Sequence, residues 1–514
     1  MFAFAAVLTA TIAAGAPTGV GAQGTSLSPA DSQLVARLLL AEERRDTATA
    51  TYADGLRHAD ARVRVIARRG LGRSRDPLFA MRDSLPALPA PPTFGAEPAW
   101  RLRYRALGRT NTDCAQLLAA LRDDTWHVRL RGADLVTSAC AADPAIVGIL
   151  RQWIRAVPTS SVRAKDGASW HGAAHGIIAL AKIVPVEALA ALPPFAASRV
   201  TEVRIYAARA ATILNDTVSL RRLAADATDN VREAAITGLA RVAGHSADDV
   251  FIAAMSARGG QAVRAAAAAL KESPRGADVL AASISAATRL QRDSSETSRR
   301  VRAAVAARVA EYAKPADWPR IAPLATDYDC RIAEAYATIG LALGVPNVAR
   351  TCKPMPITLP VDAVRLALGA GARLRVVMAD SSGGGSFTVR LRGDVAPVMA
   401  ARVLALAQSG WYSGNQWHRV EPDFVIQGGA PGANEFRGFP RFFRDELGTV
   451  PHARGTVGLS TGEHDTGDAQ WFVNLRDNLR LNRDYTVFAQ VVEGIDVVDG
   501  ILEGDVIARI EMVR

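Results

Sequence analysis

Apolar residues recur at helical spacing through most of this chain and at strand spacing near its end. Between residues 30 and 355, Ala, Leu and Val repeat three and four positions apart, as in amphipathic helices. From residue 372 the period becomes two, as in Arg373–Met378 and Ser386–Leu391, which indicates half-buried strands. The pattern therefore predicts a multidomain protein, with an all-α region followed by a β-rich one.

The helical region repeats one phrase, in which a small or acidic residue precedes Val-Arg and an Ala-rich helix. Copies of the phrase contain Val63, Val128, Val203, Val231, Val263 and Val301. The last four valines lie 28, 32 and 38 residues apart, a spacing typical of stacked helical hairpins. Val and Ala are expected to face the neighbouring repeat, and Arg to lie along the helix surface. The phrase resembles bacterial HEAT repeats, which implies an α-solenoid over residues 30–355 whose concave face binds or positions a protein.

The helical phrase ends after Cys352, and a proline-containing linker is predicted over residues 356–371. Beyond it, a helix is expected from Pro397 to about Ser409. Strand-like runs follow at 424–427, 456–459, 470–474, 486–492 and 505–512. One helix among many short strands predicts a closed antiparallel barrel over residues 372–514.

Composition and charge exclude several classes of protein. The chain has 514 residues, of which 49% are hydrophobic and 22% charged, so wholesale disorder is excluded. After residue 20 no stretch of 18 uncharged apolar residues occurs, so no stable membrane span is expected. The net charge is +10, but the arginines that dominate it are interleaved with Asp and Glu and form no long basic run. We therefore expect no nucleic-acid partner.

The N-terminal residues resemble a targeting segment. An apolar stretch from Met1 to Ala16 is followed by Val20-Gly21-Ala22, a small-x-Ala cleavage pattern. Residues 1–22 are therefore predicted to be a signal peptide, and the protein to be exported, to the periplasm. The alternative is an ordinary buried N-terminal helix.

Four cysteines allow three disulfide connectivities: Cys114, Cys140, Cys330 and Cys352. An oxidising compartment favours pairing, and the spacing favours the two local pairs Cys114–Cys140 and Cys330–Cys352. Four buried free thiols are the alternative. His171 and His175 have metal-ligand spacing on a helix, but no third ligand is evident, so we expect packing histidines and no metal site.

Several separated motifs in the C-terminal region resemble those of one family. The run Trp417-His-Arg-Val-Glu-Pro-Asp-Phe-Val-Ile-Gln-Gly-Gly429 is similar to the cyclophilin signature. Downstream, 454–460, 469–474 and 481–494 resemble further cyclophilin strands in the family's order. The resemblance spans residues 372–514 and implies a peptidyl-prolyl cis-trans isomerase on a closed antiparallel barrel with two helices.

The resemblance also assigns candidate site residues. Arg419 falls on the family's catalytic arginine. Substrate-binding positions fall on Phe424, Val425, Gln427, Ser460, Thr461, Gln470, Phe472, Leu481 and Tyr485. Among these, Ser460 and Thr461 correspond to the segment that binds the residue before proline, and the apolar and aromatic members to the wall of the proline pocket.

The chemistry of such a site requires neither a cofactor nor a metal. Amide resonance opposes rotation about an Xaa-Pro bond by about 18–20 kcal/mol, while the two isomers differ by only about 0.5–1 kcal/mol. To lower this barrier, a site needs an apolar pocket that holds the proline ring and an arginine that can donate to the prolyl nitrogen. The expected function is isomerisation of Xaa-Pro bonds in unfolded exported proteins, with the solenoid as a protein-binding or positioning module. The alternative is a non-catalytic protein that binds proline peptides, or a scaffold.

Overall fold

The computed structural model describes residues 27–76, 94, 96–108, 113–164, 167–354, 356–369, 371–436 and 438–513. The predicted signal peptide, residues 1–22, lies outside the described residues. Within the described part, no helix combines the length and apolar character needed to cross a bilayer.

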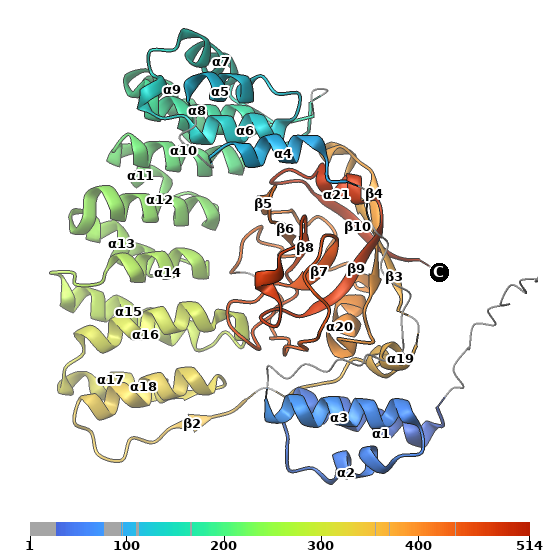
Figure 1. The fold of residues 1–514 in the computed structure, drawn as a ribbon. Helices are drawn as coiled ribbons and strands as arrows, with labels where there is room; N and C mark the ends of the chain where they lie inside the picture. Colours follow the sequence, from blue (N-terminus) through green and yellow to red (C-terminus); the bar gives the residue numbers. More distant parts are fainter. Residues whose placement is uncertain are drawn as a thin grey trace, which may run out of the picture.

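The N-terminal and central parts of the chain are helical. The helices are α1 (Pro29–Glu43), α2 (Ala50–Arg57), α3 (Ala61–Arg75), α4 (Ala99–Ala106), α5 (Cys114–Leu121), α6 (Trp126–Leu135), α7 (Pro144–Ile154), α8 (His171–Ile183), α9 (Pro185–Ala196), α10 (Thr201–Ile213), α11 (Thr217–Leu223), α12 (Asp229–Ala243), α13 (Asp248–Ala254), α14 (Gly260–Ala269), α15 (Gly276–Leu290), α16 (Arg299–Tyr312), α17 (Trp318–Ile321) and α18 (Cys330–Ala342). Helices α4 to α18 stack into an arc beside the C-terminal domain, and α1 to α3 lie below that domain (Figure 1). A stack of this kind is consistent with the predicted solenoid.

The repeated Val-Arg phrase has a clear structural role. Its six valines lie on α3, α6, α10, α12, α14 and α16 and are buried in the packing between helices. In four copies the arginine folds back and donates to main-chain carbonyls of the preceding turn: Arg64 to His58 and Ala59, Arg129 to Asp123, Arg204 to Ser198 and Arg199, and Arg232 to Asp226 and Ala227. The repeat arginine therefore fixes the turn between helices, rather than only lying along the helix surface.

Two disulfides staple the arc near its two ends. Cys114 is bonded to Cys140, with 5.6 Å between their Cα atoms, and joins α5 to the turn before α7. Cys330 is bonded to Cys352 and ties the start of α18 to the short strand β2 (Thr351–Cys352), which pairs with β1 (Thr326–Asp327).

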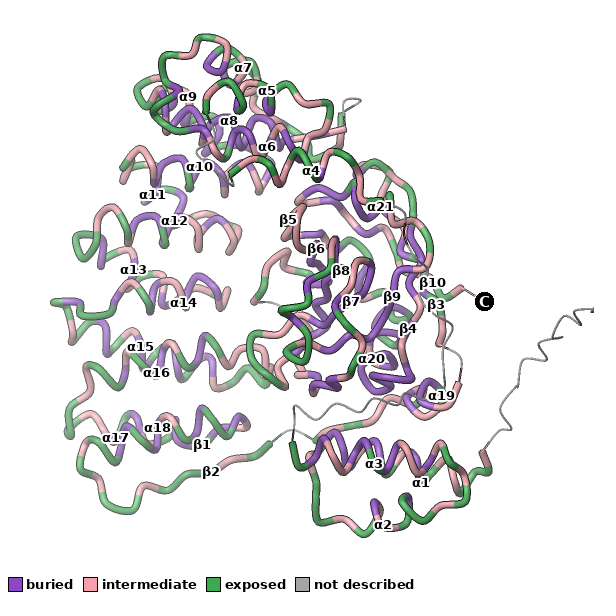
Figure 2. Tube along the Cα trace, in the orientation of Figure 1, coloured by how far each residue is buried: buried purple, intermediate pink, exposed green. Residues whose placement is uncertain are grey.

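The C-terminal domain is a curled antiparallel sheet covered by helices. Its elements are α19 (Asp362–Leu368), β3 (Arg373–Met378), β4 (Ser386–Leu391), α20 (Pro397–Gln408), β5 (Arg419–Glu421), β6 (Val425–Gly428), β7 (Thr456–Leu459), β8 (Trp471–Asn474), β9 (Val487–Glu493), α21 (Ile495–Asp499) and β10 (Ile507–Val513). The strand order is β10-β3-β4-β9-β7-β8-β6-β5. Figure 2 shows that buried residues concentrate in these strands and along the helices of the arc.

The expected closed barrel is not confirmed. Strands β10 and β5 remain the edges of the sheet, and an isolated bridge between Gln416 and Val506 joins their flanking segments. Trp417 N donates to Asp505 O at 2.8 Å, close to this bridge. Because β5 contains only three residues, a few hydrogen bonds span the gap instead of a continuous ladder.

Helices α1 to α3 share their hydrophobic core with the C-terminal domain. Leu38 and Val63 belong to the same buried cluster as Leu366 of α19 and Phe387 of β4, whereas the arc from α5 to α18 forms a separate cluster. A buried ion pair strengthens this packing, since Arg73 Nη1 lies 2.8 Å from Glu42 Oε1. The arginine also reaches carbonyls of the C-terminal domain. Helix α19 lies inside the segment predicted as a linker and packs on α20. The predicted domain boundaries remain predictions.

Helix α4 anchors the upper end of the arc to the C-terminal domain. Arg101 is fully buried, and its guanidinium donates to Pro422 O, Leu475 O and Asp499 Oδ1 at 2.8, 2.9 and 2.8 Å. Arg454 donates to the same carboxylate from within the domain.

Two histidines of the arc contribute to the same contact. His127 Nε2 lies 3.0 Å from Ile501 O and His171 Nε2 lies 2.7 Å from Glu503 O, and burial lowers the pKa of these imidazoles to about 4 and about 3. Because the neutral rings are favoured, each Nε2 donates to its carbonyl. His175, the other histidine of the metal-ligand spacing, contacts Asp134.

The lower part of the arc contacts the C-terminal domain at three further points. Asn230 Nδ2 donates to Gly432 O at 3.0 Å. The second contact is made by the loop before α16, where Glu296 N donates to Pro440 O at 2.9 Å. At α18, Arg331 Nη1 forms an exposed ion pair with Glu463 at 2.8 Å. The arc therefore bridges the space in front of β5, β6 and the 460–466 loop.

Candidate functional site

Hairpin β5–β6 carries four of the predicted site residues. Arg419 lies opposite Gln427 in the antiparallel register, while Phe424 and Val425 lie at the turn end of the hairpin. A helix outside the C-terminal domain holds the turn of this hairpin, because Arg101 of α4 donates to Pro422 O. The position of Arg419 and Phe424 thus depends on a helix that lies more than 300 residues earlier in the sequence.

A small apolar cluster forms a pocket beside Arg419. Its buried members are Val425, Phe472 and Leu481, and Phe424 and Tyr485 pack against them. The rings of Phe472 and Tyr485 meet edge to face, with centroids 5.7 Å apart at 87°.

Position 458 must be glycine for this pocket to exist. A Cβ on Gly458, which pairs with Phe472 across β7 and β8, would lie 2.4 Å from the Phe472 ring. A larger residue there would push the aromatic wall out of place.

Arg419 lies at the mouth of the pocket and is partly exposed. Its Nε is 2.9 Å from Glu421 Oε1 and its Nη1 is 3.2 Å from Gln427 Oε1. Its guanidinium carbon is 5.9 Å from the centroid of the Phe424 ring. These contacts hold the cation beside the apolar wall, where a proline ring and its amide nitrogen could be met together.

A chain of polar side chains leads away from Arg419 along the site. Gln427 Nε2 donates to Gln470 Oε1 at 3.4 Å, and Gln470 Nε2 donates to Asp468 Oδ2 at 3.2 Å. Ser460 N donates to Gln470 O at 2.9 Å, which ties the 460–466 loop to this chain. Burial raises the pKa of the Asp468 carboxyl to about 7, so much of it is neutral at neutral pH. The arrangement offers amide donors and acceptors to a peptide backbone.

All ten residues predicted for catalysis and substrate binding line one cavity of about 670 Å³: Arg419, Phe424, Val425, Gln427, Ser460, Thr461, Gln470, Phe472, Leu481 and Tyr485. They come from β5, β6, β8 and three connecting segments. Within the described ranges, no group of three or more His, Cys, Asp or Glu residues could hold a metal ion.

The second wall of the cavity belongs to the arc, whose contact with the site was not predicted from the sequence. Helices α14, α16 and α18 contribute Arg264, Ala268, Arg299, Arg300, Ala303, Ala304, Arg331, Ile332 and Ala335. Phe436 and Phe442 of the C-terminal domain line it as well. The one available signal was Arg264, which belongs to a Val-Arg phrase but makes neither of the turn contacts seen for Arg204 and Arg232.

Comparisons with known proteins identify the family of the C-terminal part of the chain. The family model described as cyclophilin type peptidyl-prolyl cis-trans isomerase/CLD matches residues 375–512. A probable peptidyl-prolyl cis-trans isomerase of Brucella suis is 30% identical over 165 residues, which cover 29% of this chain and 81% of that protein. The chain belongs to the cyclophilin-type peptidyl-prolyl cis-trans isomerase family. Its C-terminal part is a cyclophilin domain, that is, a peptidyl-prolyl isomerase domain.

Other relatives cover similar parts of the chain. A peptidyl-prolyl cis-trans isomerase of Helicobacter pylori strain J99 is 32% identical over 130 residues, covering 24% of this chain and 80% of that protein. Peptidyl-prolyl cis-trans isomerase-like 2 of Gibberella zeae is 35% identical over 118 residues, but the match spans only 22% of this chain and 20% of that protein. A crystal structure of a Cryptosporidium parvum cyclophilin is 21% identical, with a TM-score of 0.26, and the match covers 28% of this chain and 98% of that chain. Each of these relatives covers less than a third of the chain, and the family model places its match at residues 375–512.

Proposed function

We propose that this protein is an exported peptidyl-prolyl isomerase that acts on proline-containing segments of unfolded proteins in the cavity between its cyclophilin domain and its helical arc. The single observation that carries the proposal is the convergence of the ten predicted residues on that cavity. Segments separated by up to 66 positions, from Arg419 to Tyr485, contribute to it.

The residues divide into three roles. The pocket of Phe424, Val425, Phe472, Leu481 and Tyr485 would hold the proline ring. Gln427 and Gln470 would bond the peptide backbone on one side, and the main chain at Ser460 and Thr461 would bind the residue before proline. With both sides held, rotation is confined to the Xaa-Pro bond.

Arg419 would be the catalytic residue. When the amide twists, resonance is lost and the nitrogen gains a lone pair that can accept a hydrogen bond. A guanidinium donor at this nitrogen binds the twisted state more strongly than the planar one, and only such a difference accelerates the reaction. The reaction makes and breaks no covalent bond, so the site needs no nucleophile.

Export is supported by the apolar N-terminal sequence and by the pairing of all four cysteines in the structure. A positioning role for the arc is supported by its wall of the cavity. A polypeptide that reaches the proline pocket must pass between this wall and the cyclophilin domain.

Replacement of Arg419 tests the proposal. Arg419→Ala should lower kcat/KM by about 10²–10³, because loss of one preorganised donor of this kind costs about 2.7–4 kcal/mol. Arg419→Lys should restore little, since an ammonium lacks the planar fork. The measurement is exchange between the cis and trans forms of a proline peptide by NMR, with circular dichroism to check the fold.

Tyr485→Phe is the matched control, because it keeps the aromatic wall and should retain most of the activity. If Arg419→Ala stays within about threefold of the wild type, a change of only about 0.65 kcal/mol, the role assigned to Arg419 is wrong. If the wild type binds proline peptides without accelerating their exchange, the alternative of a non-catalytic binding protein holds instead.

A further inference from the structure

The helical arc presents a row of arginines to the substrate cavity. Arg264 of α14, Arg300 of α16 and Arg331 of α18 line it, and the small residues Ala268 and Ala303 leave space near them. Cyclophilin-domain residues alone account for the proline pocket, so these side chains add a feature that the isomerase mechanism does not use.

A fourth arginine of the arc that lines the cavity, Arg299, pairs with Asp329, and two of the other three also have an acidic partner nearby. Arg331 pairs with Glu463 at 2.8 Å. Arg264 lies 3.7 Å from Glu233, and its guanidinium carbon is 4.5 Å from the centroid of the Phe436 ring. Their charges are therefore partly compensated before any substrate arrives.

Arg300 differs from the other three. In the part of the chain that the structure describes, its side chain makes no ion pair or hydrogen bond, and the residue is exposed to the cavity. The charge of Arg300 acts on the buried carboxyl of Asp468, opposing the effect of burial on its pKa, but no hydrogen bond or ion pair joins these two described residues, and Asp468 Oδ2 accepts from Gln470.

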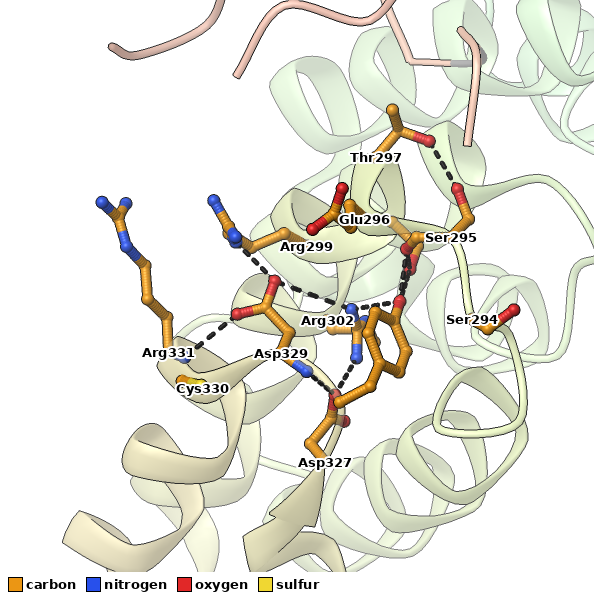
Figure 3. A network of polar contacts seen from close by, with 12 residues as sticks. Ser294, Ser295, Glu296, Thr297, Arg299, Arg302, Asp327, Asp329, Cys330 and Arg331 are labelled. Atoms are coloured by element: carbon orange, nitrogen blue, oxygen red, sulfur yellow. Dashed lines mark hydrogen bonds and ion pairs between the residues drawn. The ribbon is translucent and has the colours of Figure 1, made fainter. Parts of the chain in front are cut away.

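The turn of α16 that carries Arg300 is held firmly on its other side. Arg302 Nη1 lies 2.6 Å from Asp327 and Arg299 Nε lies 2.5 Å from Asp329, both of them buried carboxylates. Figure 3 shows Arg299 and Arg302 directed at this pair of aspartates, in a network to which Arg300 does not belong. Arg299 and Arg300 both line the cavity, but this network engages Arg299 and leaves Arg300 without an ion pair among the described residues.

The guanidinium of Arg300 lies against the loop beside the proline pocket. A Cβ on Gly462 would be 2.9 Å from both Cζ and Nη2 of Arg300, so the two groups are in close contact. Gly462 directly follows Ser460 and Thr461, the segment proposed to bind the residue before proline. Arg300 therefore lies on the N-terminal side of the bound proline.

We propose that Arg300 forms a substrate subsite that selects polypeptides with an acidic side chain one to three residues before the proline. The inference rests on the proposed isomerase function and adds its substrate class. A carboxylate at this place would meet a guanidinium that has no partner in the described chain, on a helix turn that is already fixed. The helical arc would thus set the specificity of a reaction carried out by the cyclophilin domain.

The test compares peptides that differ at one position. Acetyl-Ala-Glu-Ala-Pro-Phe-amide, its Gln and Lys analogues, and peptides with the same residue one or three positions before proline would be followed by NMR exchange. The wild type should favour Glu over Gln by about fivefold in kcat/KM at one or more of these positions. The preference should shrink as NaCl is raised from 20 to about 500 mM, because salt screens a partly exposed ion pair.

Variants of Arg300 should change the selectivity between peptides. Arg300→Gln should bring the Glu-to-Gln ratio of kcat/KM close to one, mainly by lowering kcat/KM on the Glu peptide about fivefold. Arg300→Glu should favour the Lys peptide. The matched control is Arg292→Gln, which removes an exposed arginine of the same arc that does not line the cavity.

The outcomes separate the two proposals. If no proline peptide is isomerised, the proposed function fails. If all peptides are isomerised at equal rates, or if Arg300→Gln keeps the preference for Glu, the isomerase stands and the acidic subsite is wrong.

Discussion

Arg101 and Arg454 share one buried carboxylate, and this arrangement predicts a specific coupling between them. Arg101 of α4 donates to Asp499, Leu475 O and Pro422 O, whereas Arg454 donates to Asp499 and Leu475 O. Each arginine alone therefore still binds Asp499 Oδ1 and Leu475 O, whereas Asp499 Oδ2 accepts only from Arg454 among the described residues. Only Pro422 O loses its described partner when Arg101 is removed.

The magnitudes follow from this count of partners. Arg101→Ala should lower the free energy of unfolding by about 2–3 kcal/mol, since Pro422 O is left without a donor and the packing of a fully buried side chain is lost. Arg454→Ala should lower the free energy of unfolding by about 1–2 kcal/mol, because Asp499 Oδ2 loses its donor while the carboxylate keeps Arg101 as a cation. In the double variant a carboxylate that is only 7% exposed loses both cations, and an unpaired buried charge costs about 3–5 kcal/mol. The double variant should therefore exceed the sum of the single variants by about 2 kcal/mol.

Hydrogen exchange of the Leu475 amide would measure this coupling locally. The amide donates to Phe424 O, so its exchange reports opening of the β6–β8 region beside the pocket. A double-mutant cycle would compare the free energy of opening in the wild type, both single variants and the double variant. Additive effects would refute the argument that the two arginines substitute for each other at Asp499.

Two further predictions concern pH and the extent of the folded unit. Burial lowers the pKa of His127 to about 4 and that of His171 to about 3, whereas both are about 6.5 in the unfolded chain. Because the unfolded chain then binds more protons, the contribution of the two histidines to folding stability is complete above pH 6.5 and is lost as the pH falls toward 4. The comparison is with the double variant His127→Gln/His171→Gln, which keeps side-chain donors but binds no proton. In urea titrations the wild type should lose up to about 2.7 kcal/mol of unfolding free energy per pH unit between pH 6 and 4.5, relative to this variant. If the difference in unfolding free energy does not change with pH, the two histidines are not held neutral by burial. A fragment of residues 372–514 should bind the apolar dye ANS and isomerise proline peptides poorly, because α1, α3 and α19 complete the hydrophobic core of the C-terminal domain. A monomeric fragment with full activity and no dye binding would show that the packing of these helices is dispensable.

The sequence by itself predicted several local elements, and the ten residues it proposed for the site line one cavity. The change of apolar period from helical to alternating placed the start of β3 at Arg373 and of β4 at Ser386, as observed. Arg419 and Gln427 were proposed from the resemblance to the cyclophilin signature, and the structure places them opposite each other in a local antiparallel hairpin. A short strand such as β5, with three residues, carried too little pattern to be separated from its neighbour.

Only the tertiary structure decided what lies opposite that site. The curvature of a helical stack is the sum of small rotations between repeats, each set by side-chain packing that a sequence phrase does not specify. The closure of the arc depends on pairs such as Arg101 and Asp499, which are 398 residues apart. No periodicity in the chain relates such residues. Arg300 therefore read as one more arginine of a basic helix, and it became a candidate for substrate selection only when the arc brought α16 against the loop at Gly462.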